Sequence, residues 1–192
     1  MHNRKILIIG EVYVDQHLDI IENGYSTSRL GGIFHAARSC DALNIEYALA
    51  YYAPDYLVKD VEKFGIDVLR ASSIFRLGKV DKAPNVMLIG QSDESGNQLY
   101  ENILGRQAEY VSMLPFMQVL DDFDPTDIII FPGRYGNAGI LSNLSNYEGK
   151  IHIDMNYDCD DILDLDTIKI QTVFLSTSST SCLLYTSDAA DD

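Results

Sequence analysis

The sequence predicts an α/β protein in which helices cover both faces of a parallel sheet that carries a small antiparallel insert. Continuous apolar runs rich in β-branched residues, such as Lys5–Val12, are typical of strands buried on both faces. Segments with helical spacing alternate with these runs, as they do in parallel α/β proteins. Between residues 74 and 102 the alternation stops, and strand-like segments follow one another around a polar turn.

The first 70 residues contain the start of the predicted sheet, with strand Lys5–Val12 ending before Asp15. After it we expect a short strand (18–21), a loop (22–29), a helix (33–43) that opens after Gly31-Gly32, a strand (46–52), a helix (54–64) and a short strand (67–69). Asp55 suits the first turn of the second helix, where an acidic side chain faces the positive end of the helix dipole. Gly65 is expected to end that helix.

The rest of the chain contains the antiparallel insert and then returns to the α/β alternation. The insert comprises predicted strands at 74–77, 86–91 and 98–102, and the polar residues 92–97 are typical of a hairpin turn between the last two. After the insert we expect a helix (115–120), a strand (127–131), a helix (137–144) and two further strands (150–154 and 172–175).

Composition excludes several classes of protein. Of the 192 residues, 46% are hydrophobic and 22% are charged, which is not the composition of a disordered chain. The formal net charge of -15 disfavours binding to nucleic acid or to an anionic membrane through the overall field. The sequence contains neither an apolar run of about 18 residues nor a signal-peptide pattern at its start, so we expect a cytoplasmic protein. Cys40, Cys159 and Cys182 lack the spacing of a zinc site or a disulfide framework.

Polar residues that follow the predicted strands are the first candidates for a site, because ligands bind beyond the carboxyl ends of parallel strands. Glu11, Tyr13 and Asp15 follow the first strand. Asp15 could accept hydrogen bonds from two neighbouring hydroxyls of a sugar, or it could bond its own backbone in a turn. Asp154 and Asn156 follow a later strand, where they could orient a metal-bound phosphate or a hydroxyl, or form an Asx-turn.

The start of the predicted helix 33–43 is the second candidate. Gly31-Gly32 allows the backbone to approach a ligand closely, and the helix start offers unpaired N–H groups. The same pair is also typical of a simple tight turn. His35 lies in the first turn of this helix, where it could donate to a ligand hydroxyl or carboxylate, or pack as a core residue.

Several common catalytic and nucleotide-binding motifs are absent from the sequence. Gly10-Glu11-Val12-Tyr13 lacks the G-x-G-x-x-G pattern of dinucleotide-binding proteins, which argues against a Rossmann-type dehydrogenase. The sequence also contains no Walker motif, no H-E-x-x-H and no Ser/His/Asp arrangement. The acidic residues between 158 and 166 lack the spacing of an EF-hand, and we interpret them as a solvated helix face.

Together, these segments resemble the ribokinase/PfkB family of carbohydrate kinases over about residues 5–180. The stretch from Ile8 to Asp15 resembles the first strand and the sugar-binding Asp of the family, and Leu30–Arg38 resembles its N-terminal glycine signature. Strands near 17–21 and 74–102 resemble its lid, and 128–133 and 151–156 resemble later core strands. The resemblance implies a ribokinase-like three-layer fold, with a parallel sheet, helices on both faces and a small antiparallel β lid.

The resemblance implies transfer of the γ-phosphoryl group of ATP to a sugar hydroxyl, with Mg²⁺ offsetting charge. In such an enzyme Asp15, Gly31-Gly32 and His35 bind the sugar, while Asp154 and Asn156 lie toward the phosphates. No segment of this chain matches the family's second signature, a G-A-G-D-like turn with the catalytic Asp. We therefore expect the chain to be an inactive N-terminal part of a longer kinase. Lid strands can pair between subunits, so the resemblance also allows a homodimer.

Two departures from the family pattern leave the substrate open. His35 stands near the place where the family usually has Asn, and Asn44 replaces a usual Gly after the helix. The alternatives are a nucleoside or hydroxymethylpyrimidine kinase of the same superfamily and a non-catalytic sugar-binding protein with the kinase fold. A long lid favours a sugar or a nucleoside over a small planar base.

Residues 181–192 are expected to be foreign to the native protein. The stretch from Cys182 to Asp191 resembles the translation of a sequencing adapter, and it follows the polar residues 176–180 without a turn signal. We therefore expect residues 1–180 to form the N-terminal part of a ribokinase-like domain. A half-finished sheet would leave strand 172–175 as an unpaired apolar edge, which predicts poor solubility.

Overall fold

The computed structural model describes residues 4–18, 27–92, 98–131, 140, 143–155 and 169–175. Its elements are β1 (Lys5–Glu11), β2 (Val14–His17), β3 (Thr27–Leu30), α1 (Phe34–Ala42), β4 (Glu46–Ala53), η2 (Asp55–Leu57), α2 (Val58–Lys63), η3 (Phe64–Val68), β5 (Ser73–Asp81), β6 (Val86–Ser92), β7 (Gln98–Asn102), η4 (Gly105–Gln107), β8 (Glu109–Ser112), α3 (Phe116–Phe123), β9 (Asp127–Ile130), β10 (Lys150–Met155) and β11 (Ile170–Leu175). They form two sheets.

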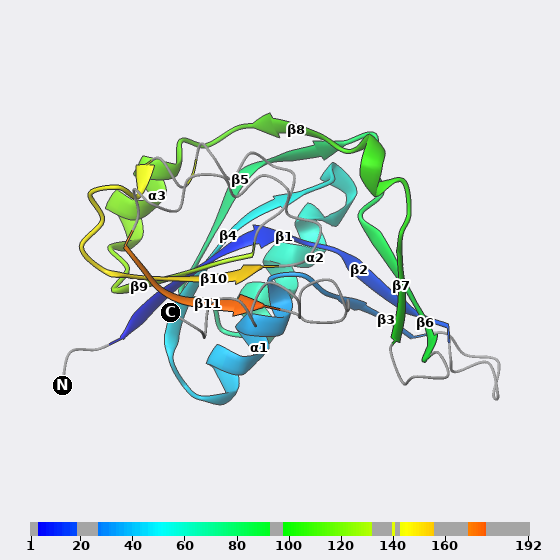
Figure 1. Cartoon of the computed structure of the whole chain (residues 1–192), viewed down its shortest axis with the longest axis horizontal. Coiled ribbons are helices and arrows are strands. Elements are labelled where there is room, and N and C mark those ends of the chain that lie inside the picture. The colour runs from blue at the N-terminus through cyan, green and yellow to red at the C-terminus, as the bar shows by residue number, and fades with distance from the viewer. Residues whose placement is uncertain are drawn as a thin grey trace, which may run out of the picture.

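The main sheet has seven strands in the order β11-β10-β9-β1-β4-β5-β8. All neighbouring pairs are parallel except β5 and β8, which are antiparallel. The carboxyl ends of the parallel strands therefore lie at one edge, and Figure 1 shows the smaller sheet beyond that edge. This arrangement confirms the predicted α/β fold class.

Two hydrophobic cores flank the main sheet, because consecutive side chains of a strand point to opposite faces. Leu7 and Ile9 of β1 pack in a cluster with the apolar face of α3. Ile6 and Ile8 pack in the other cluster with α1 and α2. These four side chains are almost fully buried, and each such burial stabilises the fold by about 1.5–3 kcal/mol. The three-layer arrangement is thus fixed by alternate residues of the central strand.

The smaller sheet, called the lid below, has the strand order β3-β2-β6-β7. The β2–β3 and β6–β7 pairs are antiparallel, whereas β2 and β6 are parallel. The chain enters the lid after β1, leaves it before α1, enters it again after β5 and returns to the main sheet at β8. Four connections therefore join the lid to the rest of the fold.

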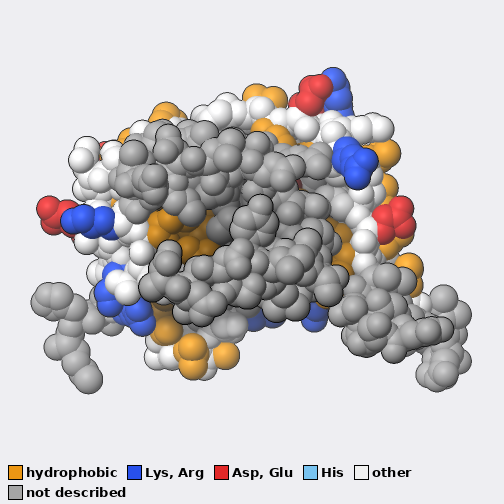
Figure 2. All heavy atoms as spheres, viewed as in Figure 1, with side chains coloured by type: hydrophobic (Ala, Val, Ile, Leu, Met, Phe, Trp, Pro, Cys, Tyr) orange, Lys and Arg blue, Asp and Glu red, His pale blue; other side chains and the backbone are white. Residues whose placement is uncertain are grey.

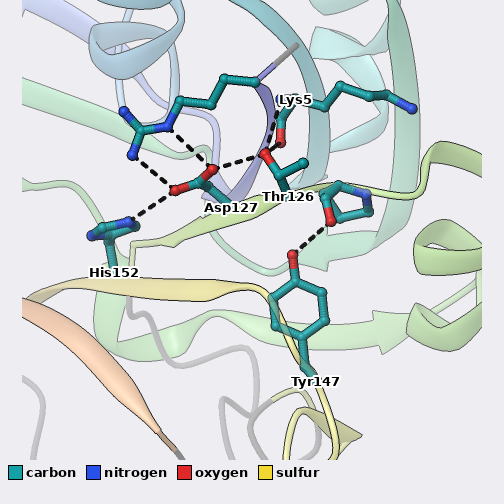
Figure 3. Close-up of polar contacts among 7 residues, drawn as sticks. Lys5, Thr126, Asp127, Tyr147 and His152 are labelled. Atoms are coloured by element: carbon teal, nitrogen blue, oxygen red, sulfur yellow. Dashed lines mark hydrogen bonds and ion pairs between the residues drawn. The ribbon is translucent and has the colours of Figure 1, made fainter. Parts of the chain in front are cut away.

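A buried ion-pair network joins the amino ends of β1, β9 and β10, at the edge opposite the lid (Figure 3). Arg4 donates to both oxygens of Asp127, over 3.2 and 2.9 Å, and Thr126 Oγ1 lies 2.8 Å from Asp127 Oδ2. Nε2 of His152 lies 3.4 Å from Asp127 Oδ1. Burial raises the pKa of Asp127, but the hydrogen bonds from Arg4 and Thr126 and the Arg4 charge outweigh burial and hold it below its usual range.

The predicted first lid strand is wrong in position. The strand is Val14–His17, whereas Leu18 lies outside it, and residues 19–21 lie outside the described part. The predicted loop 22–29 is also wrong at its end, because Thr27–Leu30 forms β3. Both strands are largely polar, so they lack the apolar pattern from which strands are predicted.

The chain around Gly65 also differs from the prediction. The helix continues through a π-helical turn to Val68, so Gly65 does not end it, and the expected strand 67–69 is absent. A Cβ at position 65 would lie 2.5 Å from Ile74 Cδ1. Gly65 therefore serves close packing against β5. Strand β8 was not predicted.

The predicted strand 74–77 does not belong to the antiparallel insert. It forms part of β5, which pairs in parallel with β4 in the main sheet, so the second part of the lid begins at β6. The remaining predicted elements agree with the structure within a few residues. Of the predicted helix 137–144, Ile140, Asn143 and Leu144 are described; the first two are helical, and Leu144 lies in a turn. Most of the predicted hairpin turn, Asn156 and residues 181–192 lie outside the described residues. No helix of the part described is long and apolar enough to cross a membrane.

Candidate functional site

The carboxylate of Asp15 lies directly against the backbone of Gly31, just beyond the carboxyl end of β1. A Cβ at position 31 would overlap both the carboxylate carbon and its two oxygens. Only glycine leaves room for this approach, since every other residue carries a Cβ. The structure thus brings together two residues that the sequence analysis proposed separately.

Gly32 is held against the end of β1 in a conformation that favours glycine. Its φ is +60°, and a Cβ there would overlap the carbonyl oxygen of Glu11. The backbone on either side is fixed, because Gly31 N donates to Tyr13 O over 2.8 Å and Ile33 N donates to Glu11 O over 3.1 Å. The glycine pair therefore forms a rigid floor beside Asp15.

The Asp15 side chain is buried, yet its Oδ2 atom has no hydrogen bond within the described part of the chain. His35 Nε2 lies 3.1 Å and Arg29 Nε lies 3.6 Å from this oxygen. Both of these side chains are about half exposed, at 50% and 51%. Exposed side chains can move away at little cost, so a ligand hydroxyl could take their place at the carboxylate.

Arg29 was not identified from the sequence. It faces Asp15 because Asp15 and Arg29 are directly paired in the antiparallel β2–β3 register. The pairing register of two polar strands cannot be predicted from the sequence, because neither strand has an apolar pattern that would fix it.

A second buried carboxylate, Glu11, joins the lid to the main sheet. Tyr13 Oη donates to its Oε2 and Tyr110 Oη to its Oε1, each over 2.8 Å. Asn85 Nδ2 donates to Glu11 Oε2 and to Val12 O, each over 3.1 Å. Tyr13, Asn85 and Tyr110 lie in or beside three of the four connections between the sheets, so one carboxylate holds these three connections together.

The network also fixes a wall of the candidate site. Burial, followed by the neighbouring charge of Glu11 and the hydrogen bond to it, raises the pKa of Tyr13, so this phenol stays protonated and remains a donor. The Tyr13 ring lies 3.3 Å from the position of a Cβ on Gly32. The aromatic ring therefore borders the floor formed by the glycine pair. Sequence analysis placed Glu11 and Tyr13 at this strand end but assigned them no role.

Asp154 does not join this group in the described residues. It lies near the end of β10, and β9 separates β10 from β1, so it is about 10 Å away across the sheet. Burial raises the pKa of its carboxyl group. Its predicted partner Asn156 falls outside the described residues.

The described residues do not by themselves fit a magnesium ion. Within them, no group of three or more His, Cys, Asp or Glu side chains could hold a metal. Asp154 offers a single carboxylate, and Mg²⁺ is usually held by one or two carboxylates together with substrate phosphates.

Comparison with solved structures shows a ribokinase-like fold. Ribokinase from Giardia lamblia aligns with a TM-score of 0.60 and 14% identity, over 86% of this chain and 54% of that protein. Fructokinase from Xylella fastidiosa aligns with a TM-score of 0.56 and 10% identity, over 80% of this chain and 53% of that protein. A sugar kinase from Pyrococcus horikoshii in complex with ATP aligns with a TM-score of 0.51 and 14% identity, over 84% of this chain and 54% of that protein.

The chain spans about half the length of these solved structures. No family model matches the sequence, and no curated protein gives a significant match. The comparisons therefore show the fold and not the activity.

Proposed function

We propose that this chain is the sugar-binding part of a carbohydrate kinase, and that the whole protein transfers the γ-phosphoryl group of ATP to a sugar hydroxyl. One observation carries the proposal: a buried Asp15 carboxylate lies against a glycine floor with one oxygen that makes no hydrogen bond. Within the described residues this oxygen has ion-pair contacts with the half-exposed His35 and Arg29 but no hydrogen bond, and two sugar hydroxyls could supply the missing hydrogen-bond donors. The fold shared with sugar kinases supports the same assignment.

In this proposal the residues of the chain bind and orient the sugar. Asp15 accepts from two hydroxyls, Gly31-Gly32 admits the sugar ring close to the backbone, and His35 donates to a further oxygen. The lid closes over the ring, which excludes water and limits wasteful hydrolysis of ATP. Asp154 and Asn156 would lie toward the phosphates of ATP, and positioning of this kind supplies much of the rate of phosphoryl transfer.

Titration of the chain with ribose, fructose and adenosine by calorimetry tests the proposal. We expect saturable binding of one of the sugars, and a loss of about 10- to 100-fold in affinity for Asp15→Asn, because charge-assisted hydrogen bonds are lost. Asp41→Asn is the matched control. Asp41 lies near the end of α1, and its ion-pair partner among the described residues is the exposed Arg70. Binding that Asp15→Asn leaves unchanged would contradict the proposal.

The same titration separates the alternatives. Preference for adenosine over both sugars would indicate a nucleoside kinase. Release of ADP, measured in a coupled assay, is expected only from a longer protein that carries a catalytic Asp, and we expect none from this chain. A longer protein that binds sugar without releasing ADP would indicate a non-catalytic sugar-binding protein. The homodimer through the lid and the cytoplasmic location stay predictions.

A further inference from the structure

A groove of about 440 Å³ lies where the lid strands β2 and β3 meet the helices α1 and α2 (Figure 1). Its described lining residues are Val14, Ser28, Arg29, Leu30, Arg38, Leu57, Asp60, Lys63, Phe64 and Val68. Asp15, Gly31, Gly32 and His35 are not among them, so this groove is distinct from the candidate sugar site, which it adjoins at Arg29. We call it the cationic groove.

Positive charge is concentrated in this groove, although the whole chain carries a formal net charge of -15. Three cationic side chains, from Arg29, Arg38 and Lys63, line it beside a single carboxylate, that of Asp60. Asp60 and Lys63 lie three residues apart on α2, so they are neighbours on the helix surface. No ion pair joins Lys63 to a carboxylate within the described residues. Arg29 pairs with Asp15, so Arg38 and Lys63 leave an excess of one positive charge over Asp60 in the groove.

Arg38 is the most rigidly placed of these cations. Its Nη2 donates to Leu30 O over 2.7 Å, and its guanidinium carbon lies 5.5 Å from the centre of the Phe64 ring. Its Nη1 atom is buried and has no hydrogen-bond partner among the described residues. Burial lowers the pKa of Arg38, and the charge of Arg29 lowers it further. A fixed guanidinium with a free donor beside a second cation is suited to an anion.

The rest of the lining is apolar. Leu30, Leu57 and Val14 come from the lid and from the start of the helical segment, while Phe64 and Val68 come from the π-helical turn η3. Turns of this kind are rare and occur frequently at functional sites. Val68 is 54% exposed and extends the apolar part of the lining toward the surface. An apolar wall beside a cationic end matches a ligand with an apolar body and an anionic head.

We propose that the cationic groove binds a small organic anion, with its carboxylate or phosphate head on Arg38 and Lys63 and its apolar body against Phe64, Leu57 and Val68. The groove volume lies within the range of about 300–1,000 Å³ that is usual for sites of small molecules. A ligand in the groove could also affect the sugar site through Arg29. Arg29 lines the groove and lies 3.6 Å from Asp15 Oδ2, so an anion that attracts Arg29 would free this carboxylate.

Titration of the chain with phenyl phosphate and with phenylacetate tests the proposal, with amide chemical shifts as the readout. Inorganic phosphate and phenol serve as the isolated head and body. We expect saturable binding with changes in the amide chemical shifts of α1, α2 and β3. The tighter-binding of phenyl phosphate and phenylacetate should have at least about tenfold higher affinity than inorganic phosphate or phenol alone. The stronger of the two anions identifies the preferred head.

Two variants and one control assign the site. Lys63→Gln changes an exposed side chain, so it should fold normally, and we expect it to weaken binding about three- to tenfold. Arg38→Gln should weaken binding by more than about tenfold. Lys59→Gln, an exposed lysine of α2 that does not line the groove, should have no effect. The proposal is overturned if the folded chain binds neither anion, or if the Lys59 and Lys63 variants bind equally.

The link to the sugar site rests on the proposed function, whereas anion binding does not. The sugar titration is therefore repeated with the groove saturated, and we expect a severalfold higher sugar affinity. Unchanged sugar affinity would overturn the link and leave anion binding standing. Absence of any sugar binding, with anion binding retained, would contradict the proposed function instead.

Discussion

A buried aspartate lies at each end of the parallel strands of the main sheet, and the two carboxylates differ in the number of hydrogen bonds that they accept. Asp15, beyond the carboxyl ends of the strands, and Asp127, at the amino ends, are each only 4% exposed. Asp127 accepts two hydrogen bonds from Arg4 and one from Thr126, and it lies near His152. Asp15 Oδ2 has no hydrogen bond in the part of the chain that is described.

This difference distinguishes a structural carboxylate from one available to a ligand. A buried charge is stable only when its partners are in place, and the fold itself supplies the partners of Asp127. At Asp15 the fold supplies glycines, which leave space, and the half-exposed side chains of His35 and Arg29. Substitutions at Asp127 should therefore affect stability, and substitutions at Asp15 should affect binding.

Gly31→Ala is expected to have the largest effect, because its Cβ would overlap the Asp15 carboxylate. Overpacking of this kind costs about 1–3 kcal/mol in the free energy of unfolding, and displacement of Asp15 should abolish sugar binding. Denaturant unfolding and calorimetric titration measure the two effects. The double variant Asp15→Ala, Gly31→Ala removes the carboxylate that clashes. It should regain stability without regaining binding, and a double variant as unstable as Gly31→Ala would place the clash elsewhere.

Asp127→Asn is expected to lower the free energy of unfolding by about 1–3 kcal/mol, because Arg4 loses its charged partner. This loss in the free energy of unfolding is smaller than for a fully buried ion pair, since the Arg4 side chain is 54% exposed. Sugar affinity should not change. Denaturant unfolding of this variant beside Asp41→Asn, which breaks an exposed pair with Arg70, provides the comparison. Equal losses in the two variants would show that burial of Asp127 contributes nothing.

The same carboxylate predicts a dependence of stability on pH. The pKa of Asp127 is lower in the folded chain than its unfolded value of about 3.9. Its stabilising contribution is therefore complete above the unfolded pKa and is lost as the pH falls through the folded pKa. Unfolding measured from about pH 5 downward should show a shallower loss of stability for Asp127→Asn than for the unmodified chain. Parallel pH profiles would mean that Asp127 does not titrate in this range.

Glu11→Gln is expected to have a smaller effect, of about 1 kcal/mol, that is confined to the lid. A glutamine keeps the size of the side chain but presents an amide NH₂ to one of the donors Tyr13, Asn85 and Tyr110. Hydrogen exchange should become faster in β2 and β6 and stay unchanged in β4. Glu62→Gln, at an exposed position of α2, is the control. Uniformly faster exchange over both sheets would contradict a local role for Glu11.

The sequence predicted the main sheet better than the lid, and the reason is burial. Strands such as β1 and β4 are buried on both faces and leave continuous apolar runs. The lid strands β2 and β3 are short and largely polar, so their positions could not be predicted. Asp15 and Gly31 could be identified from their places beside a strand end and a helix start. Arg29 could not, because its contact depends on the pairing of β2 with β3.

The smallest expected effect concerns β11, where a sheet edge and a hydrophobic surface coincide. In the described part of the chain β11 is the last strand of the order, and Val173 and Phe174 are 40% and 54% exposed on its two faces. Figure 2 shows that charged side chains lie mainly along the rim of this view, while hydrophobic side chains are also exposed near its middle.

An unpaired apolar edge can pair with another chain, whereas an isolated apolar side chain on a helix cannot extend a sheet. We therefore expect the chain to associate as its concentration rises, and Phe174→Lys to reduce this association, since a charged edge residue opposes strand pairing. Light scattering over a concentration series measures the effect. Met117→Lys, at a 45% exposed position of α3, is the matched control. Equal improvement by both variants would show that total exposed apolar surface, and not the edge of β11, drives association.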